Sequence, residues 1–426
     1  MFKADLRIIT LIFILYVSLI LGFFFNENLN YGAFRDWVAA NLSIINNFSD
    51  NFLETFLTYD QYSRHSPIYN IFLSLFLRFD FSLDLVRFIH LHLSITLIFI
   101  FYKCLEIKFK DTHKVYLIIL SLIIFLSPTF RSLSIWPDSR LPGLLFFSAT
   151  IYFFLKFEKT NSEKYIWLTS IFLIIASYIS PNFSVFFIYF FYYFLKSMKL
   201  SKIFLLLIFN FLASLPILYY IFVMDINFIA SGINVVSNKT PTSNIPMSNN
   251  NSVGLNFNLS NKIMIISTII LFHLSPVLLS KQHFLQFIYF FKKKFFFIFL
   301  INLFLIYFFD YQTSFTGGGV FFHFSNYIFN NNYFFFAVSF LSLSFLGYLS
   351  SLSLNNFFII LILILSNIQN TIYHKYYEPL ILILFFTIFK NADLNSFLSN
   401  KQNLINIYIL SLVYILMRVF KNTYLV

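Results

Sequence analysis

The sequence predicts an all-α, polytopic integral membrane protein with about 13 transmembrane helices. Of its 426 residues, 59% are hydrophobic and only 11% are charged, whereas soluble domains average about 25% charged residues. The mean hydropathy is +0.78, and apolar runs long enough to cross a bilayer recur along the chain. We therefore expect a single transmembrane domain over residues 1–426.

The cysteine and lysine contents limit the kinds of site and partner that can be expected. The one cysteine, Cys104, excludes an internal disulfide framework and a cysteine metal cluster. The net charge of +12 could indicate nucleic-acid binding, but lysines of a membrane protein gather in its cytoplasmic loops. We therefore expect membrane lipids as partners and no nucleic acid.

Apolar runs locate the transmembrane segments. The first run, Ile8–Phe25, follows a basic start and has no small-residue cleavage site after it, which predicts an uncleaved first helix. The expected spans are 7–25, 85–104, 114–130, 140–157, 165–180, 182–196, 202–224, 262–280, 294–309, 331–350, 356–369, 377–390 and 403–420. The segment 67–79 is short and is either a half-span leading into 85–104 or a separate helix.

Lysine-rich loops set the expected orientation. Lysines cluster near residues 103–114, 156–164, 196–202, 281–294 and 390–401. If these loops are cytoplasmic, the N-terminus is inside and the C-terminus outside, with 13 crossings provided that 67–104 crosses once. The outer loops are then 26–66, 131–139, 180–181, 225–261, 310–330 and 370–376.

Two outer loops are long enough to carry structure of their own. In 26–66, Ala39, Leu42, Ile45, Phe48 and Phe52 recur at roughly helical spacing, which predicts short amphipathic helices on the membrane surface. The loop 225–261 is rich in Asn, Ser and Pro, and is either a segment that orders on a ligand or a spacer. No soluble C-terminal domain is expected, since the chain ends at Val426 just after a span.

Ionisable residues near the bilayer are costly and mark candidate sites. The outer loops hold carboxylates, which can take a proton from a hydroxyl or bind a divalent cation. They also hold Arg, Lys and His, which can neutralise a phosphate. Together these groups suit transfer from a lipid-linked phosphate donor. The candidates are Asp36, Asp60, Arg64, His65, Arg131, Asp138, Arg140, His374, Lys375 and Glu378.

Each candidate also has a structural interpretation. Asp36 could cap a surface helix or pair with Arg35, and Asp138 could be the N-cap of the span that begins near Leu141. Arg131 and Arg140 could anchor helix ends. His90 and His92 lie in an apolar span and are expected to make packing or interhelical hydrogen-bond contacts. The TGGG run at Thr316–Gly319 lacks a following helix that would suit a nucleotide site.

Four short motifs resemble the GT-C superfamily of membrane glycosyltransferases, which includes protein O-mannosyltransferases and lipid A aminoarabinose transferases. The early acid of the first outer loop matches Asp36 in FRDW. The His-Pro element that opens the next helix matches HSPIYNIFLSLFLR, with His65, Pro67 and Tyr69, although Ser66 replaces the frequent middle proline. An Asp at the outer start of a later span matches Asp138, and YHKYYEPL loosely matches a C-terminal Tyr-Pro element.

The resemblance implies transfer of a sugar from a polyprenyl-phosphate donor to a hydroxyl of a lipid, glycan or protein acceptor. Asp36, Asp138 and Asp60 would be catalytic, and Asp36 and Asp138 would hold any Mg²⁺ or Mn²⁺. The donor phosphate would meet Arg64, His65, Arg131, Arg140 and Lys375, and the substrate pocket would include Pro67, Tyr69, His374, Tyr376 and Glu378. The site would face the periplasm from a bacterial inner membrane.

Two other functions remain open on the sequence. An O-antigen-type polysaccharide polymerase or ligase would use a large outer loop in the second half, for which 225–261 is available. A transporter or flippase of lipid-linked glycans would show charged residues deep within spans and helices broken by Gly or Pro near the bilayer centre. Few such residues are evident in the sequence, Pro216 being one.

Overall fold

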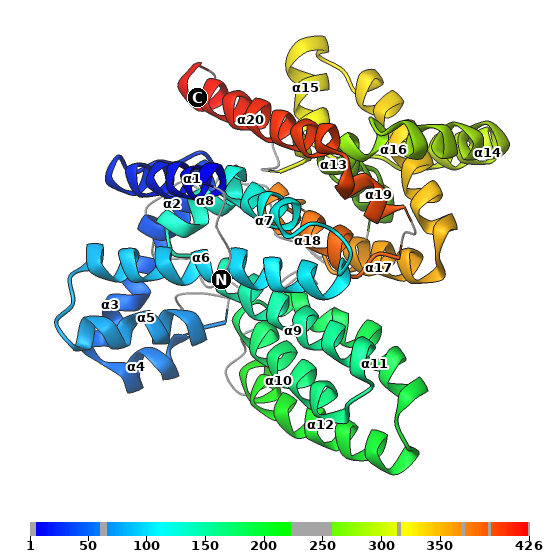
Figure 1. The fold of residues 1–426 in the computed structure, drawn as a ribbon. Helices are drawn as coiled ribbons and strands as arrows, with labels where there is room; N and C mark the ends of the chain where they lie inside the picture. Colours follow the sequence, from blue (N-terminus) through cyan, green and yellow to red (C-terminus); the bar gives the residue numbers. More distant parts are fainter. Residues whose placement is uncertain are drawn as a thin grey trace. The chain divides into compact units, whose positions relative to one another are not determined.

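A computed structural model of the chain describes residues 6–59, 66–222, 258–312, 317–367, 371–390 and 393–424. Within these ranges every regular element is a helix (Figure 1). Seven of the expected spans form helices long and apolar enough to cross a membrane, which indicates a helical integral membrane protein. They are α1 (Leu6–Phe24), α6 (Leu83–Lys108), α9 (Arg140–Thr160), α12 (Leu200–Phe222), α13 (Leu259–Leu278), α16 (Tyr333–Leu352) and α20 (Lys401–Tyr424).

The other expected spans depart from a single straight crossing. The segment 114–130 is broken into α7 (Lys114–Leu122), a 3-10 turn (Ile123–Leu126) and α8 (Pro128–Ile135), with a 65° bend. Pro128 explains the break, because its ring cannot continue the preceding helix but fits the first turn of a new one. Elsewhere, α10 (Glu163–Ile179) has 17 residues, α11 (Phe186–Ser197) has 12, and α14 (Lys281–Tyr307) has 27 with three lysines in its middle.

The chain divides into two compact units. The first comprises Met1–Ile226, Ile383–Ile388 and Leu394–Val426, and the second comprises Asn227–Leu382 and Phe389–Asp393. In the first unit, α9, α10 and α12 run side by side (Figure 1). Gly143 of α9 permits close packing against the loop that follows α10, since a Cβ there would lie 2.6 Å from the Cβ of Ser180. Phe147 then stacks on Phe183 with ring centroids 4.6 Å apart.

Short helices fill the loop after α1, as the hydrophobic spacing predicts. They are α2 (Tyr31–Asp36), a π-helical turn (Trp37–Asn41), α3 (Leu42–Asp50) and α4 (Phe52–Leu57), followed by α5 (Ile68–Arg78). Ile45 and Phe48 are fully buried, and α3 packs against α5. The apolar face of α3 is therefore covered by protein, while Ala39 and Phe52 are exposed.

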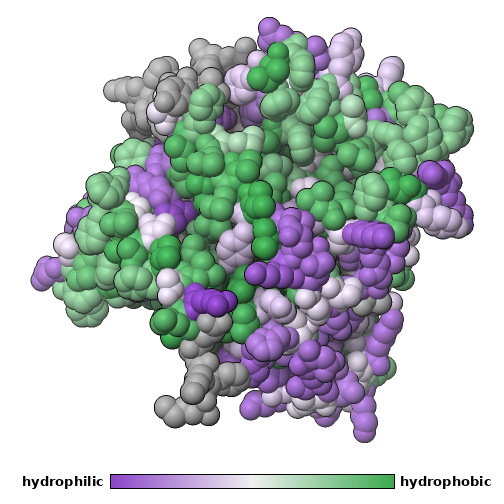
Figure 2. Space-filling model, turned by 45° about the horizontal axis from the view of Figure 1, so that its top comes forward, coloured by the Kyte–Doolittle hydropathy of each residue, from purple (hydrophilic) through white to green (hydrophobic). Residues whose placement is uncertain are grey.

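Large apolar side chains remain exposed on several of the described helices. Phe204 and Phe211 of α12 are exposed, as are Phe296 and Phe304 of α14. Figure 2 shows that hydrophobic residues cover wide areas of one face. Soluble monomers rarely expose contiguous apolar areas of this kind, so these surfaces fit contact with lipid.

The sequence predicts two crossings at 356–369 and 377–390, where the structure forms a hairpin of two short helices that we interpret as re-entrant because of their length. The hairpin belongs to the second unit except for Ile383–Ile388, which belong to the first. Its helices are α17 (Leu354–Leu365) and α18 (Leu380–Thr387), with 12 and 8 residues. These lengths correspond to about 18 and 12 Å, well short of the roughly 30 Å apolar core of a bilayer. The Asn356 side chain donates to Lys390 O at 2.9 Å and accepts from Lys390 N–H at 2.7 Å. Both ends of the hairpin are thereby held together.

The described residues 371–376, which the sequence predicts as part of an outer loop, lie against α13 within the second unit. His374, in a 3-10 turn (His374–Tyr376), contacts His273 of α13. His273 is about 21 Å along α13 from Leu259. Non-helical backbone is tolerated at such depth only where protein buries it or where it lines a cavity, and Ile372 and Tyr377 are indeed buried.

A second segment enters from the opposite end of α13. Asp310 sits at the start of α13, where its carboxylate accepts from the Asn258 and Asn261 side chains at 2.7 and 2.6 Å. By Gly319 the chain has reached the middle of that helix, since a Cβ there would lie 3.0 Å from Ile269 Cγ1. The helix α15 (Gly319–Phe329) begins at this point, so the expectation that no helix follows the TGGG run is wrong.

The two re-entrant segments meet inside the second unit. Gly318 N–H donates to Ile372 O at 2.9 Å, and Ile372 N–H donates to the Tyr311 hydroxyl at 3.2 Å. Gly317 and Gly318 adopt positive φ angles of 110° and 91°, which glycine tolerates best.

Candidate functional site

Residues 127–140 of the first unit form a buried segment that is rich in polar side chains. The Ser127 side chain caps α8 by accepting from Phe130 N–H at 3.0 Å, and every residue of α8 is buried. The chain then leaves the helix over 136–138 before α9 begins at Arg140. This break turns buried polar side chains and carbonyl groups toward α5, α6 and the loop after α1.

Asp138 lies at the centre of this segment and is buried. Its Oδ1 accepts from Arg140 N–H, the first residue of α9, at 2.8 Å, and its Oδ2 is 3.4 Å from Arg140 Nη1. The side chain therefore caps α9, although Ser139 holds the N-cap position itself. Asp138 is also near enough to Tyr69 and His90 to interact electrostatically with both.

Tyr69 and His90 form a hydrogen-bonded chain beside Asp138. His90 Nε2 is 2.7 Å from Leu133 O, and a carbonyl oxygen can only accept, so Nε2 carries the proton. In the neutral ring Nδ1 must then accept from the Tyr69 hydroxyl, which is its other partner. His92 pairs with Tyr16 of α1 at 3.0 Å. The prediction of interhelical hydrogen bonds for both histidines is confirmed.

Arg131, expected at a donor phosphate, is bound by other protein groups. Its Nε and Nη2 donate to the two carboxylate oxygens of Glu27 at 2.6 and 2.5 Å. Its Nη1 and Nη2 also donate to the hydroxyl and carbonyl oxygens of Ser18, both at 3.0 Å. This bidentate pair joins α8 to α1 and to the chain that follows it.

Arg87 is a buried cation that the sequence reasoning missed. Its guanidinium lies over the Trp136 ring at 3.9 Å and donates to Ile135 O at 3.3 Å and to Asn26 Oδ1 at 2.9 Å. It also pairs with Asp84. An arginine within the apolar run that begins at Leu83 was the signal that could have identified it.

The loop after α1 lies against the same buried segment. Phe34 packs on Trp136 with ring centroids 4.7 Å apart, and Asn41 Nδ2 donates to Pro137 O at 3.2 Å. Asp36, half-buried, is the last residue of α2 and makes no capping hydrogen bond to the following turn. The short helix that carries Asp36 is thus held next to the segment that carries Asp138.

The motif YDQYSRHSPIYN is described only in its second part. Asp60, Arg64 and His65 lie outside the described residues. Pro67 takes the N-cap position directly before α5, and Tyr69 enters the first turn of that helix. Of this motif, the structure therefore places only Tyr69 among the residues around Asp138.

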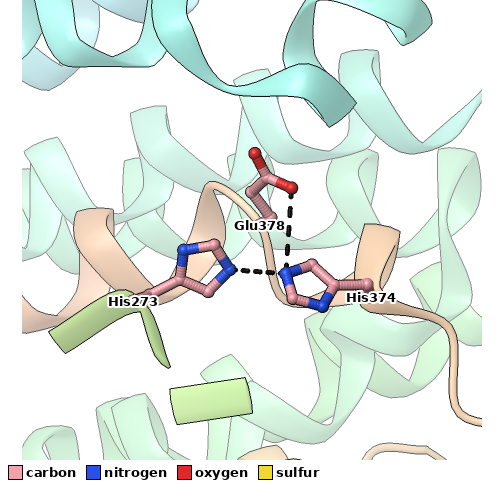
Figure 3. Close-up of side chains that lie close together, drawn as sticks. All are labelled: His273, His374 and Glu378. Carbon is pink, nitrogen blue, oxygen red and sulfur yellow. Dashed lines mark hydrogen bonds and ion pairs between the residues drawn. The ribbon is translucent and has the colours of Figure 1, made fainter. Parts of the chain in front are cut away.

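The C-terminal candidates gather in the second unit around a residue that was not predicted. Figure 3 shows that His273, His374 and Glu378 lie close together, with His374 joined by dashed lines to both of the others. The Nε2 atoms of His273 and His374 are 2.7 Å apart, and His374 Nε2 is 3.9 Å from Glu378 Oε2. Lys375 is buried, with its ammonium 5.3 Å from the Tyr373 ring centroid, and half-buried Tyr376 packs against the same ring.

His273 was missed because nothing beside it in the sequence marks it as a site residue. It stands alone in the apolar run ILFHLSP, and His374 is 101 positions away. A histidine inside a predicted span was the available signal. The structure thus forms two polar clusters, Asp138–Arg140–Tyr69–His90 in the first unit and His273–His374–Glu378 in the second.

Comparisons with known proteins add no assignment, since no family model, curated protein or solved structure matches the chain.

Proposed function

We propose that the protein is a membrane glycosyltransferase of the GT-C type that moves a sugar from a polyprenyl-phosphate donor to an acceptor hydroxyl. The observation that carries the proposal is the buried Asp138 carboxylate, held by Arg140 and lying near Tyr69 and His90. A short loop helix that carries Asp36 packs next to it. Carboxylates beside a cation at a break between apolar helices suit this transfer.

The chemistry assigned to these residues is a single displacement at the sugar. The acceptor oxygen bonds to the anomeric carbon as the bond from that carbon to the donor phosphate breaks, and polyprenyl phosphate leaves. Asp36 takes the proton of the acceptor hydroxyl. Arg140, which Asp138 positions through the Arg140 backbone N–H and guanidinium, stabilises the charge on the leaving phosphate. Arg131, by contrast, is held by the bidentate pair with Glu27 and by Ser18.

A divalent cation is not needed for this assignment. Carboxylate oxygens such as those of Asp36 and Asp138 suit Mg²⁺ or Mn²⁺. However, Arg140 engages both oxygens of Asp138, one through its backbone N–H and the other through its guanidinium. Both oxygens of Asp138 are therefore already occupied by a cationic residue, which suits an ion pair better than coordination of a metal ion. No step is assigned to a metal.

The test is sugar transfer in membranes that contain the expressed protein. Undecaprenyl-phosphate mannose, glucose and aminoarabinose, each labelled in the sugar, serve as donors. We expect Asp36→Asn and Asp138→Asn to lower transfer at least tenfold, while Glu163→Gln, at the exposed pair with Lys202, leaves it unchanged. Full transfer by both aspartate variants, at equal amounts of folded protein, would remove the assignment.

One observation favours a second function, transport of a lipid-linked glycan. The two re-entrant segments meet at Gly318 and Ile372, beside the middle of α13. Transporters place their substrate sites at such broken helices near the bilayer midplane. The polymerase or ligase alternative has no such support, because the loop on which it depends falls mostly within 223–257, outside the described residues.

A further inference from the structure

We infer that His273, His374 and Glu378 form a binding site for a divalent transition-metal ion, the class that Zn²⁺ represents. These three residues offer ligand atoms that lie within 4.8 Å of one another. The site belongs to the second unit and does not depend on the proposed sugar transfer. It is also separate from the Asp36–Asp138 pair, where the sequence placed a cation.

The separations fit a metal after small side-chain movements. Two ligands at 2.0–2.1 Å from a tetrahedral Zn²⁺ lie about 3.3 Å apart. The distance between the histidine Nε2 atoms, 2.7 Å, is shorter than this, and that between His374 Nε2 and Glu378 Oε2, 3.9 Å, is longer. Movements of roughly half an ångström at each atom would bring both distances to the tetrahedral value. The third pair of ligand atoms, which lies within 4.8 Å, must close by up to about 1.5 Å.

The chemistry of the donors selects the class of metal. Two imidazoles and one carboxylate suit Zn²⁺ and other first-row transition metals, whereas Mg²⁺ and Ca²⁺ prefer oxygen ligands. The same donor set also serves Fe²⁺, so metal analysis must distinguish the two. Three protein ligands leave at least one coordination position open, as in catalytic rather than structural zinc sites.

Burial and charge favour an ion at this place. Glu378 is 4% exposed and His273 is 8% exposed, and a buried carboxylate is costly unless it is paired or coordinates a metal. His374, whose Nε2 is 3.9 Å from Glu378 Oε2, carries a charge only when it is protonated.

Two of the three proposed ligands lie on a segment whose position is fixed by hydrogen bonds. His374 and Glu378 belong to the re-entrant hairpin, whose tip is fixed by the Gly318 and Tyr311 hydrogen bonds to Ile372. His273 belongs to α13. A metal would therefore join the hairpin to α13, so its binding should stabilise the fold as well as fill the site.

The experiment is metal analysis of the full-length protein, purified in detergent with a tag that contains no histidine. The protein is treated with EDTA, exchanged into metal-free buffer, incubated with a small excess of ZnSO₄ and freed of unbound ion. We expect about one Zn²⁺ per chain, and a higher melting temperature with Zn²⁺ than with EDTA. Analysis of protein purified without added metal shows whether zinc or iron is held natively.

Variants distinguish this site from adventitious binding. His374→Gln and Glu378→Gln should each lose at least 90% of the bound zinc and the zinc-dependent rise in melting temperature. His283→Gln is the matched control, because His283 is a buried histidine of the same unit that pairs with Tyr348. Wild-type protein that is monodisperse but binds no zinc or iron, or equal zinc in the His374 and His283 variants, would overturn the inference.

Discussion

Neutralising Glu27 should destabilise the protein strongly, because Glu27 anchors the buried Arg131 guanidinium. The Arg131 side chain is 6% exposed and that of Glu27 is 20% exposed. Breaking a buried ion pair by removing one partner costs about 3–5 kcal/mol. Since Glu27 retains some solvent and Gln can still accept one hydrogen bond, we expect Glu27→Gln to cost about 3 kcal/mol. That corresponds to roughly a 150-fold change in the unfolding equilibrium.

The assay is unfolding of the purified protein in mixed micelles with increasing SDS, followed by circular dichroism. A double-mutant cycle with Arg131→Met isolates the pair, and the double variant should cost about 2 kcal/mol less than the sum of the singles. The matched control is Glu163→Gln, whose pair with Lys202 is nearly half exposed and should contribute at most about 1 kcal/mol. Equal losses for Glu27→Gln and Glu163→Gln, or additive costs in the cycle, would refute the reasoning.

Three further substitutions test individual contacts by the same unfolding assay. Tyr69→Phe removes the donor to His90 Nδ1 and should cost about 1–3 kcal/mol; no loss would mean that this buried nitrogen finds another partner. Asn356→Ala removes both side-chain hydrogen bonds to Lys390 and should cost about 2 kcal/mol and speed proteolysis near the hairpin; unchanged proteolysis would contradict its role. Gly317→Ala forces a positive φ on alanine and places a Cβ 2.5 Å from Ile372 O, which should cost at least about 2 kcal/mol. Gly347→Ala, where a Cβ would lie 3.2 Å from the Phe290 ring, should cost less, and equal costs would count against the re-entrant geometry.

The sequence predicted the long spans because their signal is local. A continuous apolar run of about 20 residues needs no knowledge of its neighbours, and seven of the expected runs form such helices. The segment of α17 and α18 was predicted as two crossings for the same reason, since both helices are apolar. Their actual lengths, 12 and 8 residues, could not be read from hydropathy.

The candidate sites could be predicted only in part, because the residues that contact one another in them are far apart in the sequence. Asp138 was singled out as an acid next to an apolar run, and Tyr69 was named only through the resemblance to GT-C enzymes. The pairing of Arg131 with Glu27, 104 positions away, was not. The approach of His374 to His273 likewise depends on the re-entrant hairpin. Composition and spacing describe which groups are present, whereas packing between elements determines which of them meet.

The proposal of sugar transfer is tested most directly by following both halves of the donor in sealed proteoliposomes. The vesicles contain the purified protein, undecaprenyl-phosphate donors labelled in the sugar, and a membrane extract as the source of acceptors. We predict that the labelled sugar leaves the lipid, that free polyprenyl phosphate accumulates, and that Asp138→Asn abolishes both. Movement of the intact donor from one leaflet to the other, with no release of polyprenyl phosphate, would contradict the proposal and favour transport.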